Sequence, residues 1–218
     1  MGYNIAIDGP ASAGKSTIAK LVAKEKNFIY VDTGAMYRAM SLFFMQQQLE
    51  ASNIEAIEAI CTQAVISIAY ENGVQQVYLN DENVTIQLRE ETVGNMASKT
   101  ATIPAVRAHL LKLQKDLAES YDVVMDGRDI GTNILPNADL KIYLTASVEA
   151  RANRRFLELT NKGVACDFTE IAQDIQERDD RDMNREIAPL TQAEDAILVD
   201  SSNMTIEEVV GTILGACK

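Results

Sequence analysis

A glycine-rich segment near the start of the chain has the residue types and spacing needed to bind phosphate groups. Its residues are Gly9, Pro10, Ala11, Ser12, Ala13, Gly14, Lys15, Ser16 and Thr17. The glycines let the backbone curl so that its N–H groups point at phosphate oxygens, and a helix that follows adds its positive end. We expect Lys15 to reach the β- and γ-phosphates of ATP and the Ser16 hydroxyl to bind Mg²⁺. The segment therefore predicts a nucleoside triphosphate site.

A second set of charged residues follows another apolar run of the chain. Asp126, Arg128 and Asp129 come directly after residues 123–125, Val-Val-Met. At the end of a buried strand beside the phosphate loop, Asp126 is placed like the carboxylate that holds a magnesium-bound water in enzymes with such a loop. We predict Ser16 and Asp126 as the metal site, with a solvated turn as the alternative.

Arginines are grouped in two further places, each with helical spacing. The first group is Arg151, Arg154 and Arg155. The second is Arg178 and Arg185 with Asp182 between them, at a spacing that would put all three on one face of a helix. Taken alone, either group is typical of a surface helix with salt bridges. Beside a phosphate loop in an acidic chain, they indicate a site for a second polyanion, because guanidinium groups bind phosphate bidentately and stay charged.

The type of acceptor follows from the same charges. An acceptor phosphate is already ionised near neutral pH and needs no general base, whereas a hydroxyl acceptor, as on a sugar or shikimate, would favour a positioned carboxylate. We therefore favour a phosphate acceptor. A GTPase would need Asn-Lys-x-Asp, but Asn161-Lys162 continues as Gly163-Val164.

Regular alternation of apolar runs and helical patterns predicts how these groups are positioned. Five short apolar runs are predicted as buried strands, at residues 4–8, 28–32, 123–126, 140–144 and 197–200. The intervening helical patterns predict an α/β fold with a parallel sheet covered on both faces. Three of the first four runs end in aspartate, and ligands of such sheets lie beyond the carboxyl ends of the strands.

Residues 65–88 follow a different pattern. Three short runs, 65–70, 75–80 and 84–88, are separated by turn sequences, which predicts a small antiparallel meander inserted into the parallel-sheet protein. From spacing alone, a surface decoration without function is an equal alternative.

Composition and charge exclude several classes of function. The chain has 218 residues and a formal net charge of −12, which argues against binding to nucleic-acid polymers. No apolar run approaches the roughly 20 residues that cross a bilayer. The three cysteines, at positions 61, 166 and 217, predict neither structural disulfides nor a zinc site. We expect a cytoplasmic monomer that binds small molecules and no membrane.

At this point the chain resembles the bacterial cytidylate kinases over nearly its whole length. The resemblance rests on the phosphate loop and on residues 32–38, 97–98, 106–107, 126–132 and 178–189. It implies a single P-loop kinase domain, residues 1–218, with three layers around a central parallel five-stranded sheet. It also implies a monophosphate-binding region with a small antiparallel three-stranded insert, at about residues 36–105, and a short lid, at about residues 154–165.

The resemblance further implies phosphorylation of CMP and dCMP by direct in-line transfer from ATP, with Mg²⁺. The acceptor phosphate would contact Thr33, Arg38, Arg128 and Arg185, the ribose Arg178 and Asp182, and the cytosine edge Ser98, Arg107 and Asp129. Charge in the transition state would be neutralised by Lys15, Arg128, Arg154, Arg178 and Arg185. A kinase for UMP or AMP, and an ATP-binding regulatory module without turnover, stay open as alternatives.

Overall fold

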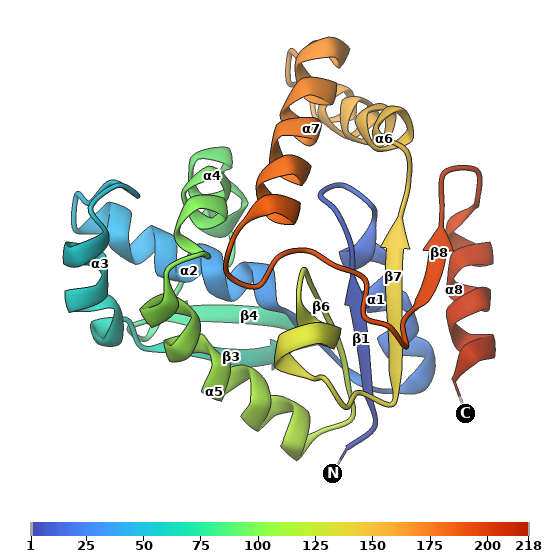
Figure 1. Cartoon of the computed structure of the whole chain (residues 1–218), viewed down its shortest axis with the longest axis horizontal. Helices are drawn as coiled ribbons and strands as arrows, with labels where there is room; N and C mark the ends of the chain where they lie inside the picture. Colours follow the sequence, from blue (N-terminus) through green and yellow to red (C-terminus); the bar gives the residue numbers. More distant parts are fainter. Residues whose placement is uncertain (1, 218) are drawn as a thin grey trace.

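A five-stranded parallel sheet forms the centre of the computed structural model, which describes residues 2–217 (Figure 1). Its strands are β1 (Asn4–Asp8), β2 (Ile29–Asp32), β6 (Val123–Gly127), β7 (Leu140–Thr145) and β8 (Ile197–Asp200), in the order β2-β6-β1-β7-β8. All five lie where the apolar runs predict them. The prediction of a parallel α/β sheet is confirmed.

Helices cover both faces of the sheet and divide the core into two parts. The covering helices are α1 (Lys15–Lys26), α2 (Thr33–Gln46), α5 (Pro104–Ser120) and α8 (Ile206–Ala216). Side chains alternate across a strand, so Ile5 and Ile7 of β1 pack with α1 and α8, while Ala6 packs in the cluster that contains α2 and α5. The result is the expected three-layer arrangement.

The small insert lies between α2 and α5. It contains α3 (Ile54–Ile60), η1 (Cys61–Gln63), β3 (Ile66–Glu71), β4 (Val74–Leu79), β5 (Glu82–Asn83), η2 (Gln87–Arg89) and α4 (Glu91–Thr100). Its three strands form an antiparallel sheet, as predicted. The amide side chain of Gln75 attaches β4 to the main sheet, since its Oε1 accepts from the backbone N–H of Asp32 at 2.9 Å.

The third strand of the insert is not where the sequence predicts it. Residues 84–88 were expected as the strand, but β5 is the pair Glu82–Asn83 and ends before Val84. The hydroxyl of Thr85 accepts from the backbone N–H of Val77 at 2.9 Å. A side chain thus takes a place in the hydrogen-bond ladder that a strand backbone would hold, which stops the pairing.

A helical hairpin of α6 (Val148–Asn161) and α7 (Phe168–Asn184) projects beyond the sheet (Figure 1). It has a small apolar core of its own, in which Ala152, Ile171 and Ile175 are buried. Residues 154–165 form most of α6 and part of the connection to α7. Within the described part of the chain, no helix is long and apolar enough to span a membrane.

Candidate functional site

The glycine-rich segment forms a loop between β1 and α1 whose shape requires its glycines. Gly9 has φ of 151°, and a Cβ there would lie 1.9 Å from the carbonyl oxygen of Leu144. Gly14, which precedes α1, has φ of 90°. Both angles disfavour any side chain. The strand, loop and helix order predicted for a phosphate loop is therefore present.

Lys15 begins α1 and is buried within this loop. Its Nζ donates to the carbonyl oxygen of Pro10 at 2.7 Å. Burial lowers the pKa of Lys15 to about 7, and the positive charge of Arg128 acts in the same direction, against the carboxylates of Asp126 and Asp182. An anion that enters the loop would favour the charged form of Lys15, since its negative charge would compensate for the water that burial removes.

The carboxylate of Asp126, at the end of β6, lies next to the start of α1. Ser16 Oγ donates to its Oδ2 at 2.9 Å, and the Tyr30 hydroxyl donates to its Oδ1 at 2.8 Å. Burial raises the pKa of Asp126 to about 6, and the charge of Asp32 adds to this. A carboxylate and a hydroxyl are hard oxygen donors of the kind that Mg²⁺ prefers.

This donor set is small, and that also fits magnesium. Among residues 2–217, no group of three or more histidine, cysteine, aspartate or glutamate side chains is arranged to hold a metal ion. Mg²⁺ typically keeps several waters and is bound through one or two carboxylates together with substrate phosphates.

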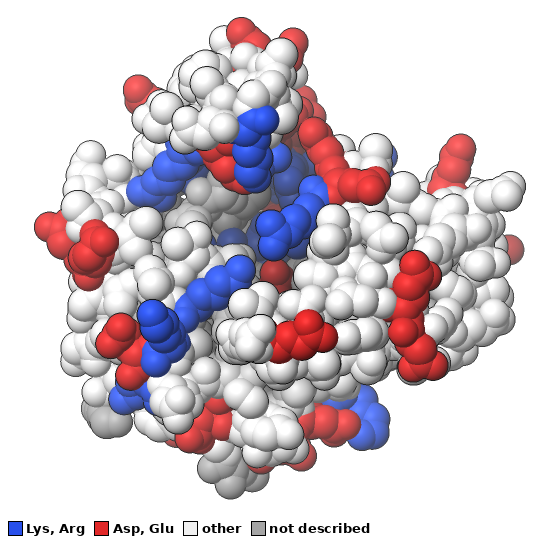
Figure 2. All heavy atoms as spheres, turned by 180° about the vertical axis from the view of Figure 1, so that it is seen from behind, with Lys and Arg blue, Asp and Glu red and all other residues white. Residues whose placement is uncertain are grey.

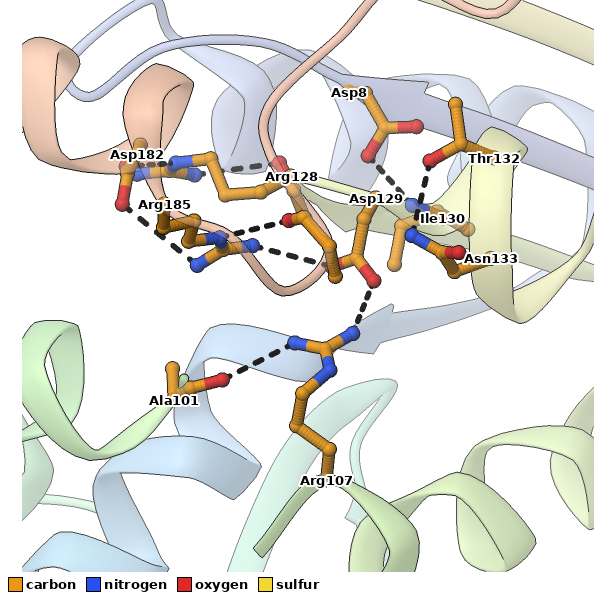
Figure 3. Close-up of polar contacts among 12 residues, drawn as sticks. Asp8, Ala101, Arg107, Arg128, Asp129, Ile130, Thr132, Asn133, Asp182 and Arg185 are labelled. Carbon is orange, nitrogen blue, oxygen red and sulfur yellow. Dashed lines mark hydrogen bonds and ion pairs between the residues drawn. The ribbon is translucent and has the colours of Figure 1, made fainter. Parts of the chain in front are cut away.

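In the network that contains Arg128, Asp129 and Asp182, carboxylates and guanidinium groups alternate (Figure 3). Arg128 Nε donates to Asp182 Oδ2 at 2.7 Å. Arg185 lies between two carboxylates, 3.9 Å from Asp182 Oδ1 and 3.6 Å from Asp129 Oδ1. Arg107 pairs with the other oxygen of Asp129. The sequence-predicted residues Arg107, Arg128, Asp129, Asp182 and Arg185 thus form one network from three separate parts of the chain.

Arg185 joins this network from outside the helix in which it was expected. The prediction of one helical face for Arg178, Asp182 and Arg185 is wrong at its last member, because α7 ends at Asn184 and Arg185 has extended backbone angles. Its Nε donates to the carbonyl oxygen of Ala188 at 2.7 Å. A loop contact, and not helical spacing, directs this guanidinium toward the two carboxylates.

Among the charged groups that shift the pKa of Arg178, guanidinium groups outnumber carboxylates. Burial lowers this pKa, the nearby charges of Arg128 and Arg38 lower it further, and the carboxylate of Asp182 opposes them. The buried Nε of Arg178 has no hydrogen-bond partner among residues 2–217, and the same is true of the buried Oγ of Ser98. Mutually repelling guanidinium groups and unpaired buried polar atoms are features of a site that binds an anionic ligand, because the ligand would pair with both. Seen from behind, Lys and Arg side chains surround a hollow below the α6–α7 hairpin (Figure 2).

Two of the sequence-predicted residues make other contacts. The Thr33 hydroxyl donates to the backbone carbonyl of Asp126 at 2.7 Å. Arg154 lies apart from the network, with its guanidinium donating to the carbonyl oxygen of Ser201, after β8, at 2.5 Å.

The other two arginines singled out on α6 differ in their contacts. Arg151 is buried, pairs with Asp179 of α7 at 2.6 Å and donates to the carbonyl of Ala11 in the phosphate loop at 3.0 Å. Arg155 pairs with Glu158 at the surface. Arg151 therefore connects the hairpin to the phosphate loop.

Two residues at the site were not predicted individually. Tyr30 reaches Asp126 from the neighbouring strand, and Asp8 accepts from the backbone amides of Ile130 and Gly131 at 2.8 and 2.7 Å. The run of aspartates at strand ends was a signal for Asp8. Only the pairing of β2 with β6 brings Tyr30 to Asp126.

Comparison with solved structures supports the fold alone. A gluconokinase from Sinorhizobium meliloti 1021 aligns with a TM-score of 0.51 and 12% identity, covering 99% of this chain and 91% of that one. An uncharacterized protein from Eubacterium ventriosum aligns with a TM-score of 0.54 and 11% identity, covering 99% and 98%.

Sequence comparison is more specific. The sequence model of the cytidylate kinase family matches residues 5–218. A cytidylate kinase of Listeria welshimeri is 52% identical over 96% of this chain and 93% of its own length. One of Caldicellulosiruptor saccharolyticus is 50% identical over 97% of this chain and 93% of its own length. The chain belongs to the cytidylate kinase family.

Proposed function

We propose that this enzyme transfers the γ-phosphoryl group of ATP to the phosphate of CMP or dCMP, giving ADP with CDP or dCDP. Membership of the family and the names of the relatives support the reaction. The structural observation that carries it is the surplus of guanidinium groups around Arg178, next to the buried Lys15 of a phosphate loop. A site for ATP alone has no use for this second set of cations.

On the donor side, the backbone amides of residues 9–14 and the Lys15 ammonium would bind the ATP phosphates. Ser16 and Asp126 would hold Mg²⁺, which supplies charge neutralisation at the β- and γ-phosphates when bound. Lys15 would exchange its contact with the carbonyl of Pro10 for a phosphate oxygen. That exchange restores a full charge partner to a buried ammonium group.

On the acceptor side, Thr33, Arg38, Arg128 and Arg185 would bind the CMP phosphate. Contact through Thr33 requires its hydroxyl to turn away from the carbonyl of Asp126. An arriving phosphate competes with Asp129 and Asp182 for Arg185, so substrate binding would rearrange the ion pairs of the network. Arg178 and Asp182 would contact the ribose.

The cytosine edge would be read by Ser98, Arg107 and Asp129. The exocyclic amine of cytosine donates to a carboxylate, while its ring nitrogen and carbonyl accept from arginine and serine. The unpaired Oγ of Ser98 and the Arg107–Asp129 pair fit that pattern. Uracil would turn a carbonyl toward Asp129, which disfavours UMP.

In the reaction, an oxygen of the CMP phosphate attacks the γ-phosphorus while the bond to the bridging oxygen of ADP breaks. The acceptor is already ionised, so no general base is required. Lys15, Arg128, Arg178 and Arg185 would neutralise the charge shared by the two nucleotides in the transition state. No covalent enzyme intermediate forms.

Motion would complete the site. In this proposal residues 1–218 act as one kinase domain, residues of about 36–105 enclose the monophosphate, and residues of about 154–165 act as the lid. Closure would exclude water from the transferring group. Arg154 would have to leave Ser201 to reach the phosphates.

Coupled ADP release tests the proposal, with MgATP and, separately, CMP, dCMP, UMP, AMP, GMP and shikimate. Rapid turnover confined to CMP and dCMP is the expected result. Turnover confined to another acceptor would overturn the cytosine assignment but keep the kinase. Binding of ATP without turnover on any acceptor would favour a regulatory module.

A further inference from the structure

The carboxylate of Asp8 is buried between the donor and acceptor sides and has no part in the reaction as proposed. Asp8 ends β1, directly before Gly9 of the phosphate loop, and only 5% of the residue is exposed. Its two oxygens accept from the backbone amides of Ile130 and Gly131, at 2.8 and 2.7 Å. Figure 3 shows the contact with Ile130. These are the first two residues of the helical turn η3 (Ile130–Ile134).

Asp129 precedes that turn, at a position where aspartate normally binds the first free amides with its own side chain. Within the described residues, the Asp129 side chain makes no such capping bond, and only its backbone carbonyl takes part, accepting from Asn133 at 2.9 Å. Asp8 caps the turn in its place, from a different strand. The Asp129 carboxylate is thereby left to face Arg107 and Arg185.

We propose that Asp8 is a positioning residue that fixes the start of η3 and so directs the Asp129 carboxylate toward the acceptor. Because Asp8 is continuous with the phosphate loop, one side chain sets the donor and acceptor halves relative to each other. The inference rests on the proposed function and extends it to a residue outside the phosphate loop, the metal site and the acceptor contacts.

The ionisation of Asp8 gives this role a measurable pH dependence. Burial raises the pKa of Asp8 to about 6, against the two amide hydrogen bonds. Asp129 raises this pKa further, Lys15 of α1 opposes it, and the phenol of Tyr143 on β7 also lies within electrostatic range. Ionised Asp8 accepts from both amides, whereas the protonated acid has one oxygen that donates. Because the two amide hydrogen bonds lower the pKa of Asp8, its protonation in the buried position in turn weakens them, and η3 should loosen below about pH 6.

The test is Asp8→Asn, which keeps the shape and one acceptor but turns an NH₂ group toward the other amide. At about pH 8, the Kd and the KM for CMP are expected to rise about 10-fold, with the Kd for MgATP changed less than about twofold. The ratio of the variant's CMP Kd to that of the parent should fall toward one at about pH 5, where the parent is also protonated. The CMP phosphate titrates near pH 6 in both proteins, so the ratio removes its contribution.

Two further measurements separate positioning from general loss of structure. Thr205→Ala removes a side-chain cap from α8, far from the site, and should leave both Kd values unchanged. Hydrogen exchange at the Ile130 and Gly131 amides, corrected for the intrinsic pH effect, should accelerate in Asp8→Asn at about pH 8 and in the parent below about pH 6. The parent measurement needs no substitution, so the idea stays testable if the variant fails to fold.

Unchanged CMP binding by a folded Asp8→Asn, or an equal loss of CMP and MgATP binding, would overturn the inference. So would a ratio that is independent of pH. Failure of the parent to phosphorylate CMP would instead contradict the proposed function, because that result does not involve Asp8.

Discussion

The donor and acceptor halves of the site are built in opposite ways. The phosphate-binding part of the donor half is one continuous segment, residues 9–17, in which backbone geometry surrounds a single buried lysine, and only the metal ligand Asp126 and its neighbour Tyr30 come from other strands. The acceptor half as proposed draws on α2, α4, α5, the segment after β6 and the end of α7, and ion pairs between side chains hold its charged residues together. One half is held by main-chain conformation and the other by electrostatic balance.

This difference predicts how each half responds to change. The phosphate loop holds Lys15 against a main-chain carbonyl, so losing one side chain leaves the loop itself in place. In the acceptor half, Asp129 and Asp182 each pair with two arginines, so removing one member changes the charge balance around several others. A single substitution in the donor half should therefore impair one step, whereas a single substitution in the acceptor half should disturb several ion pairs together.

Lys15→Ala should have the largest effect. We expect kcat with CMP to fall about 10³-fold, because a buried cation aimed at the transferring group is removed. The Kd for CMP should change little if the halves are separable, and calorimetry measures this directly. Lys24→Ala, at an exposed position of the same helix, is the matched control. A comparable loss of CMP affinity in Lys15→Ala would show that the halves are not independent.

Arg185→Ala should come next, with kcat/KM lowered about 10²-fold for every monophosphate acceptor that the enzyme uses. The guanidinium is lost as a phosphate ligand, and Asp129 and Asp182 both lose a partner. Parallel assays with CMP, dCMP and UMP measure the effect, and Arg181→Ala, at an exposed position of α7, serves as the control. A loss confined to CMP would contradict the assignment of Arg185 to phosphate.

Asp129→Ala should lower kcat/KM for CMP about 30-fold, since the base loses an acceptor and Arg107 loses its counterion. MgATP binding should be retained, which titration calorimetry can establish. Asp116→Ala, which breaks a surface pair with Lys112, is a suitable control. If ATP and CMP binding declined together, Asp129 would support the fold or the metal and not the base.

Tyr30→Phe should have the smallest effect, about a fivefold fall in kcat. The change removes only the hydroxyl that donates to Asp126, while Ser16 keeps its bond to the other oxygen. The Mg²⁺ concentration that gives half-maximal rate should rise, and Mn²⁺ binding followed by electron paramagnetic resonance checks the same point without turnover. Tyr78→Phe, in the insert, controls for loss of a tyrosine hydroxyl. No change in metal binding would remove Tyr30 from the donor half.

The same contrast explains which parts of the site could be predicted. The strand, loop and helix order around residues 9–17 was predicted correctly because these residues are consecutive and Gly9 and Gly14 are required by local backbone angles. The parallel sheet was predicted from continuous apolar runs, whose strands are buried on both faces. Val84–Leu88 was mispredicted because the side chain of Thr85 ends the ladder, a contact that no periodicity reveals.

By itself, the sequence determined the α/β sheet, the phosphate loop, and which arginines and aspartates were available for an acceptor. Only the tertiary structure decided that Arg185 faces Asp129 from outside a helix, that Arg154 instead contacts Ser201, and that Asp8 caps η3. The physical reason is the distance along the chain over which each interaction acts. Backbone angles and apolar periodicity act between neighbouring residues, whereas the partner of a charged side chain is chosen among groups that only the folded sheet brings within a few ångströms.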